Sequence, residues 1–193
     1  DVFTQNYPTE VAAMNQYTTT YQSNNGTIYA MWSSYFNALN NVNAAIDRSK
    51  SVILKTDDPD GIEPSALAQL VAEAKALRAW YLFEIVRNWG QGPLKINESK
   101  EPSYTVEYSN GAAFYQQIFT DLEEAISVLP WRQMGSNYGR MSKAAAKHIR
   151  ALAYLTRGYE EYADPKDFEN AFKDAEDVYL NSGYKLLDDY AMV

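Results

Sequence analysis

The sequence predicts an all-α fold, a stack of antiparallel helical hairpins, and three observations lead to that prediction. Apolar residues recur at spacings of three and four over most of the chain, which is the period of a helix with one buried face. Clusters of proline, glycine, asparagine and aspartate separate these runs. Hydrophobic residues make up 46% of the 193 residues and charged residues 22%, a balance typical of a globular chain with a substantial core.

The first predicted helix spans residues 27–48. One face of it carries apolar residues at helical spacing: Ile28, Met31, Trp32, Tyr35, Phe36, Leu39, Val42 and Ile46. Pro59 and Gly61 break this pattern in a turn at 57–65. Pro64 or Ser65 can begin the next helix, because proline is tolerated in a first helical turn.

The second predicted helix spans residues 65–89. Its apolar stripe consists of Leu67, Leu70, Ala74, Leu77, Tyr81, Ile85 and Trp89, with Trp80 beside it. Gly90 suits the left-handed position that follows a helix, and Pro93 prevents the helix from restarting. We expect Arg78 to lie against neighbouring helices, paired with a carboxylate or with helix-end carbonyls.

Three further helices are predicted at 112–130, 143–162 and 166–182. Pro130 closes the first of them, Ser142 is a suitable N-cap for the second, and Gly183 ends the third. Small residues mark the places where helices would cross: Ala144, Ala145, Ala151, Ala171 and Ala175. The unit 143–183 is about as long as one tetratricopeptide repeat, so the predicted architecture is a tetratricopeptide-like stack in which each hairpin needs its neighbours.

Several classes of function find no support in the sequence. The net charge of −8 argues against nucleic-acid partners, and the absence of cysteine excludes disulfides and zinc–thiolate sites. His148 is the sole histidine, and the sequence shows no set of residues that would join it in catalysis or metal binding. Asp57, Asp58 and Asp60 precede Gly61 as in a calcium loop, but an EF-hand placed there would end at Leu67 instead of a glutamate. We therefore predict no catalytic residues, metal or cofactor.

The strongest chemical signal is aromatic. The chain has 16 tyrosines, and the segment 15–29, "NQYTTTYQSNNGTIY", places Tyr17, Tyr21 and Tyr29 among amide and hydroxyl side chains. Such a mixture suits sugar binding, because a flat ring stacks on the C–H face of a sugar while amides bind its hydroxyls. The same composition also describes an ordinary polar loop, and chemistry alone does not decide between the two readings.

Four stretches, in order along residues 28–190, resemble the SusD/RagB family of surface lipoproteins. The first is the run Trp32, Phe36, Leu39, Asn43 and Ile46, which is similar to the family's Trp–Tyr–Ile–Asn–Ile helix. The others are "EAKALRAWYLFEIVRNWGQGPL" (73–94), "GRMSKAAAKHIRALAYL" (139–155) and "FENAFKDAEDVYLNSGYKLLDDY" (168–190). Three positions depart from the family pattern: Phe36 replaces tyrosine, Gln91 replaces an acid and Ser142 replaces threonine.

The resemblance implies what the residues alone do not. Residues 1–193 would be the SusD-like N-terminal helical region of a larger protein, with an irregular segment at 1–27 and helical repeats over 28–193. The family binds glycans, or peptides in some members, without covalent chemistry. It sits on the outer face of the outer membrane, held by a lipidated cysteine that would precede Asp1, over a TonB-dependent, SusC-like β-barrel transporter.

In the family, the segment before the tryptophan helix contributes to the ligand site. That places Tyr17, Tyr21, Asn24, Asn25 and Tyr29 in a predicted ligand-binding site. The alternative is a tetratricopeptide-type scaffold that binds a protein or peptide partner in its groove. The irregular loops at 49–64, 92–109 and 131–142 favour the first interpretation, because a scaffold of this type repeats at a regular interval of about 34 residues.

Overall fold

The computed structural model describes residues 14, 22, 25–103, 105–185 and 189. Within them the chain forms five long helices: α2 (Gly26–Ser49), α3 (Pro64–Trp89), α4 (Gly111–Val128), α5 (Lys143–Arg157) and α6 (Asp167–Asn181). A short 3₁₀ helix, η1 (Gly135–Asn137), lies between α4 and α5. The described residues contain two isolated β-bridges and no strand. The predicted all-α fold is confirmed.

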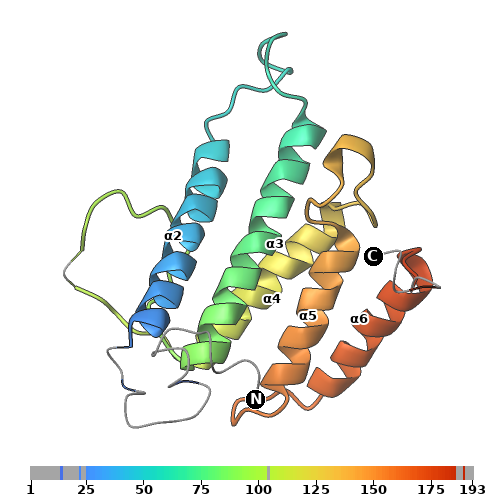
Figure 1. Ribbon diagram of the computed structural model, residues 1–193. Helices are drawn as coiled ribbons and strands as arrows, with labels where there is room; N and C mark the ends of the chain where they lie inside the picture. The colour runs from blue at the N-terminus through green and yellow to red at the C-terminus, as the bar shows by residue number, and fades with distance from the viewer. Residues whose placement is uncertain (1–13, 15–21, 23–24, 104, 186–188, 190–193) are drawn as a thin grey trace.

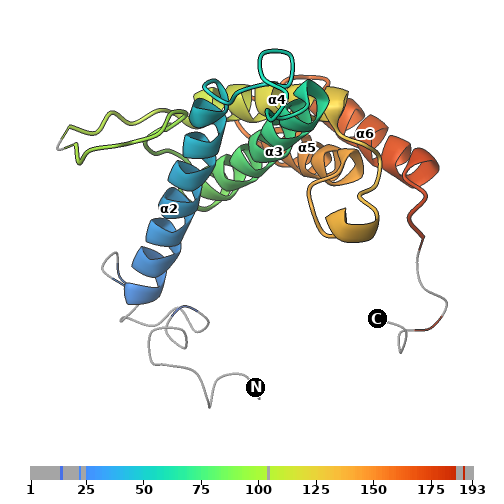
Figure 2. The same ribbon diagram turned by 90° about the horizontal axis from the view of Figure 1, so that it is seen from above.

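Helices that are neighbours in the sequence are neighbours in space. α2 packs on α3, α3 on α4, α4 on α5 and α5 on α6, and α3 also touches α5. Figure 1 shows the helices side by side, and Figure 2 shows from above that α4 lies behind α3 and α5. This order is that of stacked helical hairpins, in which each unit buries its apolar face against the next.

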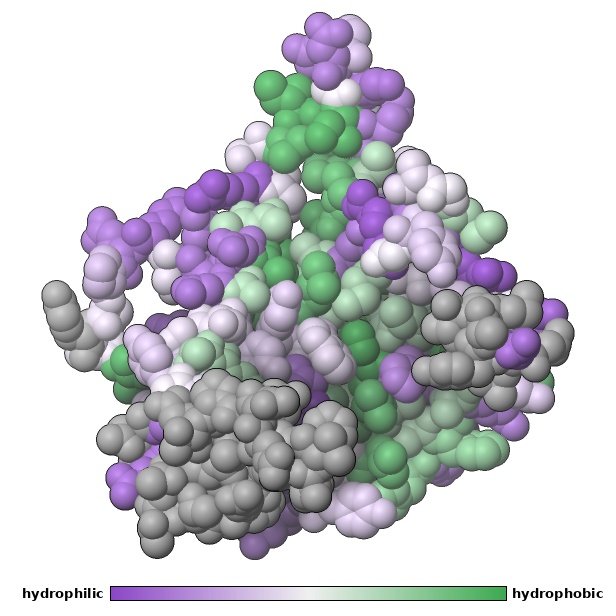
Figure 3. All heavy atoms as spheres, in the orientation of Figure 1, coloured by the Kyte–Doolittle hydropathy of each residue, from purple (hydrophilic) through white to green (hydrophobic). Residues whose placement is uncertain are grey.

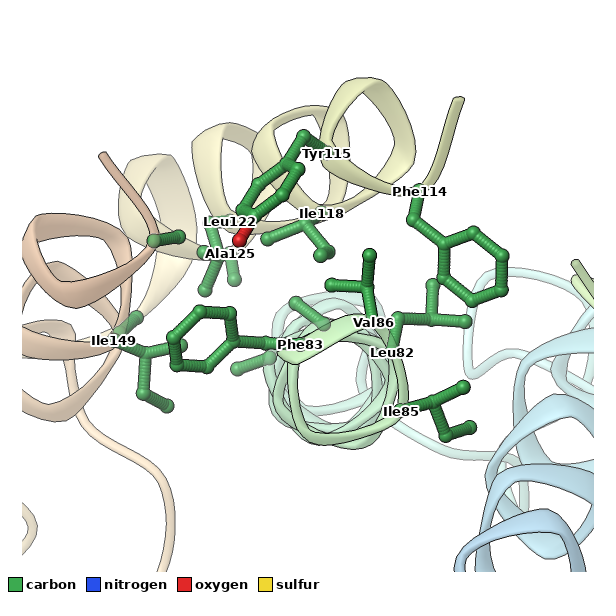
Figure 4. Close-up of a cluster of buried hydrophobic side chains, with 14 of the residues drawn as sticks. Leu82, Phe83, Ile85, Val86, Phe114, Tyr115, Ile118, Leu122, Ala125 and Ile149 are labelled. Carbon is green, nitrogen blue, oxygen red and sulfur yellow. The ribbon is translucent and has the colours of Figure 1, made fainter. Parts of the chain in front are cut away.

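The core is centred on α3, which has helices on several sides (Figure 4). From α3, Ala76, Ala79, Leu82 and Phe83 are fully buried, and they meet Phe114, Ile118 and Leu122 of α4 and Ala146 and Ala153 of α5. The apolar stripe expected for this helix was too narrow, and Leu70, one of its members, is 44% exposed. A single stripe describes a helix with one covered face, whereas α3 is covered by α2 on one side and by α4 and α5 on the other.

Most helix ends lie where the sequence placed them. Pro64 occupies the first turn of α3, Gly90 follows that helix with a φ of 74°, and the Ser142 Oγ accepts a hydrogen bond from Ala145 N at 3.2 Å. One boundary differs by more than two residues. α5 ends at Arg157 rather than at residue 162, and the Arg157 guanidinium is bound there by the Asp167 carboxylate at the start of α6.

Buried arginine–aspartate pairs join neighbouring helices. Arg78 of α3 donates to both carboxylate oxygens of Asp121 of α4, with Nε–Oδ2 and Nη2–Oδ1 distances of 2.8 and 2.6 Å. Its Nη1 donates to the Ile96 carbonyl at 2.8 Å, and Asn43 Nδ2 of α2 donates to the carbonyls of Lys95 and Asn97. The expected carboxylate partner of Arg78 is confirmed, and the carbonyl belongs to a loop instead of a helix end. This network fixes the start of the 92–109 loop to three helices.

Candidate ligand-binding site

Two of the five predicted ligand-binding residues, Asn25 and Tyr29, lie at the beginning of α2. Tyr17, Tyr21 and Asn24 lie outside the described residues. Asn25 immediately precedes α2, and Tyr29 lies in the first turn of that helix. Two of the five residues are therefore brought to one end of the molecule, and both stay candidates for ligand contact.

Asn25 has a clear local role as the N-cap of α2. Its Oδ1 accepts hydrogen bonds from the backbone N–H groups of Thr27 at 3.0 Å and Ile28 at 3.2 Å. The residue is 4% exposed. Because an N-cap satisfies backbone donors that have no partner inside the helix, Asn25 fixes where α2 begins and how Tyr29 is presented.

Tyr29 is 71% exposed and lies one turn from a packed group of aromatic side chains. This aromatic cluster joins α2 to the end of α3 and consists of Trp32, Tyr35, Phe36, Tyr81 and Trp89. The ring centroids of Trp32 and Phe36 are 4.5 Å apart, and Trp32 meets Trp89 edge-on at 5.0 Å. Such contacts favour particular ring arrangements, and here they pack α2 against the end of α3.

One polar contact crosses this cluster. The Tyr35 hydroxyl donates to Glu84 Oε2 at 3.3 Å, and the Glu84 carboxylate also accepts from Arg87 Nη2 at 2.7 Å. Burial, together with the negative charge of Glu84, raises the pKa of Tyr35. The phenol therefore stays neutral and keeps its proton to donate at physiological pH.

Among the described residues, we find no arrangement that points to catalysis or metal binding. No group of three or more histidine and acidic side chains is close enough to hold a metal ion there. His148 is exposed on α5. Asp57, Asp58 and Asp60 form part of an exposed turn in which the Asp60 N–H donates to Asp58 Oδ1, so the predicted turn is confirmed. No helix in the described ranges has the length and hydrophobicity to span a bilayer.

Surface depressions that were not predicted from the sequence include an apolar groove and a polar pocket. An apolar groove of about 390 Å³ runs between α5 and α6 and is lined in part by alanines. Its lining residues are His148, Ala151, Leu152, Leu155, Phe168, Ala171, Phe172 and Ala175. Figure 3 shows hydrophobic side chains gathered over these two helices. A polar pocket of about 200 Å³ lies between α3 and the connector, residues 131–142.

The sequence contained a signal for the groove but none for the pocket. Phe168 and Phe172 are four residues apart, as are Ala171 and Ala175, so one face of α6 alternates large and small side chains. The polar pocket joins the α3 residues Gln69 and Glu73 to Asn137 and Arg140 of the connector. More than 60 residues separate Gln69 from Asn137, and only the folded chain brings them together.

Comparisons with known proteins show which family this chain resembles in sequence and fold. A family model described as SusD-like, starch-binding and associating with the outer membrane matches residues 2–159. A SusD-like protein of Bacteroides ovatus is 30% identical over 163 residues, which is 82% of this chain and 28% of that protein.

Two solved structures agree with this match. One is a crystal structure with xylogluco-oligosaccharide and the other is a laminarin-binding SusD-like protein. Each is 28% identical, covers 82% of this chain and superposes with a TM-score of 0.69. The chain spans 30% and 32% of their respective lengths. With a family model matching most of its residues, this chain belongs to the SusD-like family of starch-binding proteins that associate with the outer membrane.

Proposed function

We propose that this protein captures glycans at the cell surface without catalysing a reaction and delivers them to a TonB-dependent, SusC-like transporter. The observation that carries the proposal comes from two solved relatives of the same fold. One is described as a crystal structure with xylogluco-oligosaccharide, and the other as a laminarin-binding SusD-like protein. Because the chain spans about a third of those proteins, the activity of the whole protein is part of the proposal. The family's association with the outer membrane supports a surface location, with a lipid anchor as the expected attachment.

The start of α2 is the proposed contact for the glycan. Tyr29 presents an exposed ring beside the aromatic cluster, and the Asn25 cap fixes the turn that carries it. An exposed aromatic ring can stack on the C–H face of a sugar. Tyr17, Tyr21 and Asn24 complete the proposed site as the sequence predicts it.

Calorimetric titration tests the glycan proposal. Soluble xyloglucan and laminarin oligosaccharides are titrated into the protein and into its Tyr29→Ala variant. Loss of one stacking contact is expected to weaken binding about three- to tenfold. Tyr179→Ala is the matched control, because Tyr179 is 81% exposed and lies on α6, far from α2 in the sequence. If a panel of polysaccharides gave no heat on titration while a panel of peptides did, the proposal that the ligand is a glycan would be wrong.

The transporter partner needs a separate experiment. The protein is expressed with an affinity tag in its native host and purified from membranes in a mild detergent. We expect an outer-membrane β-barrel of the TonB-dependent class to copurify in a fixed ratio. Recovery of soluble proteins alone would refute the pairing and leave the glycan proposal standing.

A further inference from the structure

We propose that the polar pocket between α3 and the connector is a second carbohydrate subsite, which takes one ring of a neutral oligosaccharide. The inference rests on the proposed glycan-binding function but assigns a different surface. Its six lining residues are Ala66, Gln69, Leu70, Glu73, Asn137 and Arg140. Glu73 and Trp89 are 16 residues apart on α3, so roughly 24 Å of helix separates the pocket from the end of α3 that packs against Trp32.

The polar wall of the pocket is built before any ligand arrives. Glu73 is 7% exposed, and its Oε1 accepts hydrogen bonds from Gln69 Nε2 and from Gln133 Nε2, both at 3.2 Å. Its Oε2 accepts from Arg140 Nε at 2.8 Å. Gln133 Nε2 also donates to the Met141 carbonyl at 2.7 Å, and this hydrogen bond links the two ends of the connector. Groups held in this way lose little further entropy when a ligand binds.

Two side chains on the wall retain hydrogen-bonding capacity. Arg140 uses Nε for Glu73, and neither of its terminal Nη groups has a partner among the described residues. The Arg140 side chain is 41% exposed, so these donors are accessible. The Asn137 side chain likewise makes no hydrogen bond within the described part of the chain, although its backbone N–H donates to Met134. An amide provides both donors and an acceptor, which is what sugar hydroxyls require.

Charge and shape favour a neutral sugar over an ion. The Arg140 guanidinium and the Glu73 carboxylate neutralise one another at 2.8 Å, so the wall carries no net charge to attract an anion. Ala66 and Leu70 provide an apolar side, and Leu70 is 44% exposed. A volume of about 200 Å³ is below the range of drug-sized ligands and suits a single ring with one apolar face.

Nuclear magnetic resonance can report on both proposed sites in one titration. Protein labelled with ¹⁵N is titrated with xylogluco-oligosaccharide and with laminari-oligosaccharide up to about 10 mM, ten times a weak Kd of about 1 mM. The reporters for the pocket are the backbone signals of residues 137–140 and the side-chain amides of Gln69 and Asn137. The reporters for the start of α2 are residues 26–32. We expect saturable shifts at the pocket with at least one of the two sugars.

Every outcome of the titration is informative. Shifts at the pocket but not at 26–32 support the subsite and count against the α2 site. Shifts at 26–32 alone overturn the subsite and leave the proposed function intact. An absence of shifts in both regions refutes the subsite and the α2 site together. Sodium glucuronate is the charged comparison, and tighter binding of glucuronate than of the neutral sugars would overturn the assignment of ligand class.

A pair of variants tests the contact itself. Asn137→Ala removes an exposed side chain without internal hydrogen bonds, so the fold should be unaffected. We expect it to weaken the Kd at the pocket about fivefold, the effect of one hydrogen bond. Ser136→Ala is the control, since Ser136 lies in the same 3₁₀ turn and does not line the pocket. Equal Kd values for the two variants would overturn the role of Asn137 and with it the subsite.

Discussion

Replacing Asp121 with alanine is expected to lower the free energy of unfolding by about 3–5 kcal/mol. The variant loses two hydrogen bonds from Arg78, at 2.8 and 2.6 Å, and one from Gln117 at 3.1 Å. The Arg78 side chain is 8% exposed and that of Asp121 is 1% exposed. Because both side chains lie away from bulk solvent, the guanidinium stays buried without its counterion. A loss of that size is a large part of the 5–15 kcal/mol that stabilises a typical domain.

Urea unfolding followed by circular dichroism at 25 °C measures this loss. The control is Glu124→Ala, because Glu124 pairs with Lys75 across the same two helices but its side chain is 52% exposed. Exposed pairs contribute about 1 kcal/mol at most, so the control should barely move the midpoint. The double variant Arg78→Leu/Asp121→Ala should recover part of the loss. If Asp121→Ala cost no more than Glu124→Ala, the pair would not be the buried link described above.

Two further predictions concern the loops. The backbone N–H of Glu98, and then Lys50, lower the pKa of the Asp47 carboxyl to about 2 from 3.8. The contribution of Asp47 to holding residues 97 and 98 on α2 is therefore complete above about pH 4 and is lost as the pH falls through about 2. A ¹³C-detected titration midpoint near 3.8 would contradict this. A Cβ at Gly111 would lie 2.0 Å from the Tyr162 hydroxyl, so Gly111→Ala should destabilise the fold by about 1–3 kcal/mol in urea unfolding. The Tyr162→Phe change removes the hydroxyl but keeps Cζ, 2.7 Å from the added Cβ, so it should restore part of that loss. No recovery at all would show that the hydroxyl does not cause the loss.

The sequence predicted the helices well because their signals are local. Pro64, Gly90 and Ser142 determine helix ends through interactions within a few residues, and all three act as expected. The predicted end of α5 was wrong because the helix ends where Arg157 binds Asp167 across a turn. The breadth of the buried surface on α3 was also missed, because it is set by how many helices surround α3 and not by the α3 sequence.

The candidate site was less predictable than the fold. Tyr29 could be chosen from composition, since an aromatic residue in a polar segment is visible in the sequence. The capping role of Asn25 requires knowing that α2 begins at Gly26, one residue before the expected start. The polar pocket depends on contacts between Glu73 and Arg140, which are 67 residues apart, and no local pattern reports such a pair.

The linear order of helix packing has a consequence for motion. Within the described residues, α2 has α3 as its single helical neighbour, whereas α3 is held by α2, α4 and α5. Local opening requires the loss of fewest contacts at the ends of such a stack. The end that carries Tyr29 can therefore loosen and close again while the α3–α4–α5 core stays folded, and the polar pocket beside the connector rests on that more stable core.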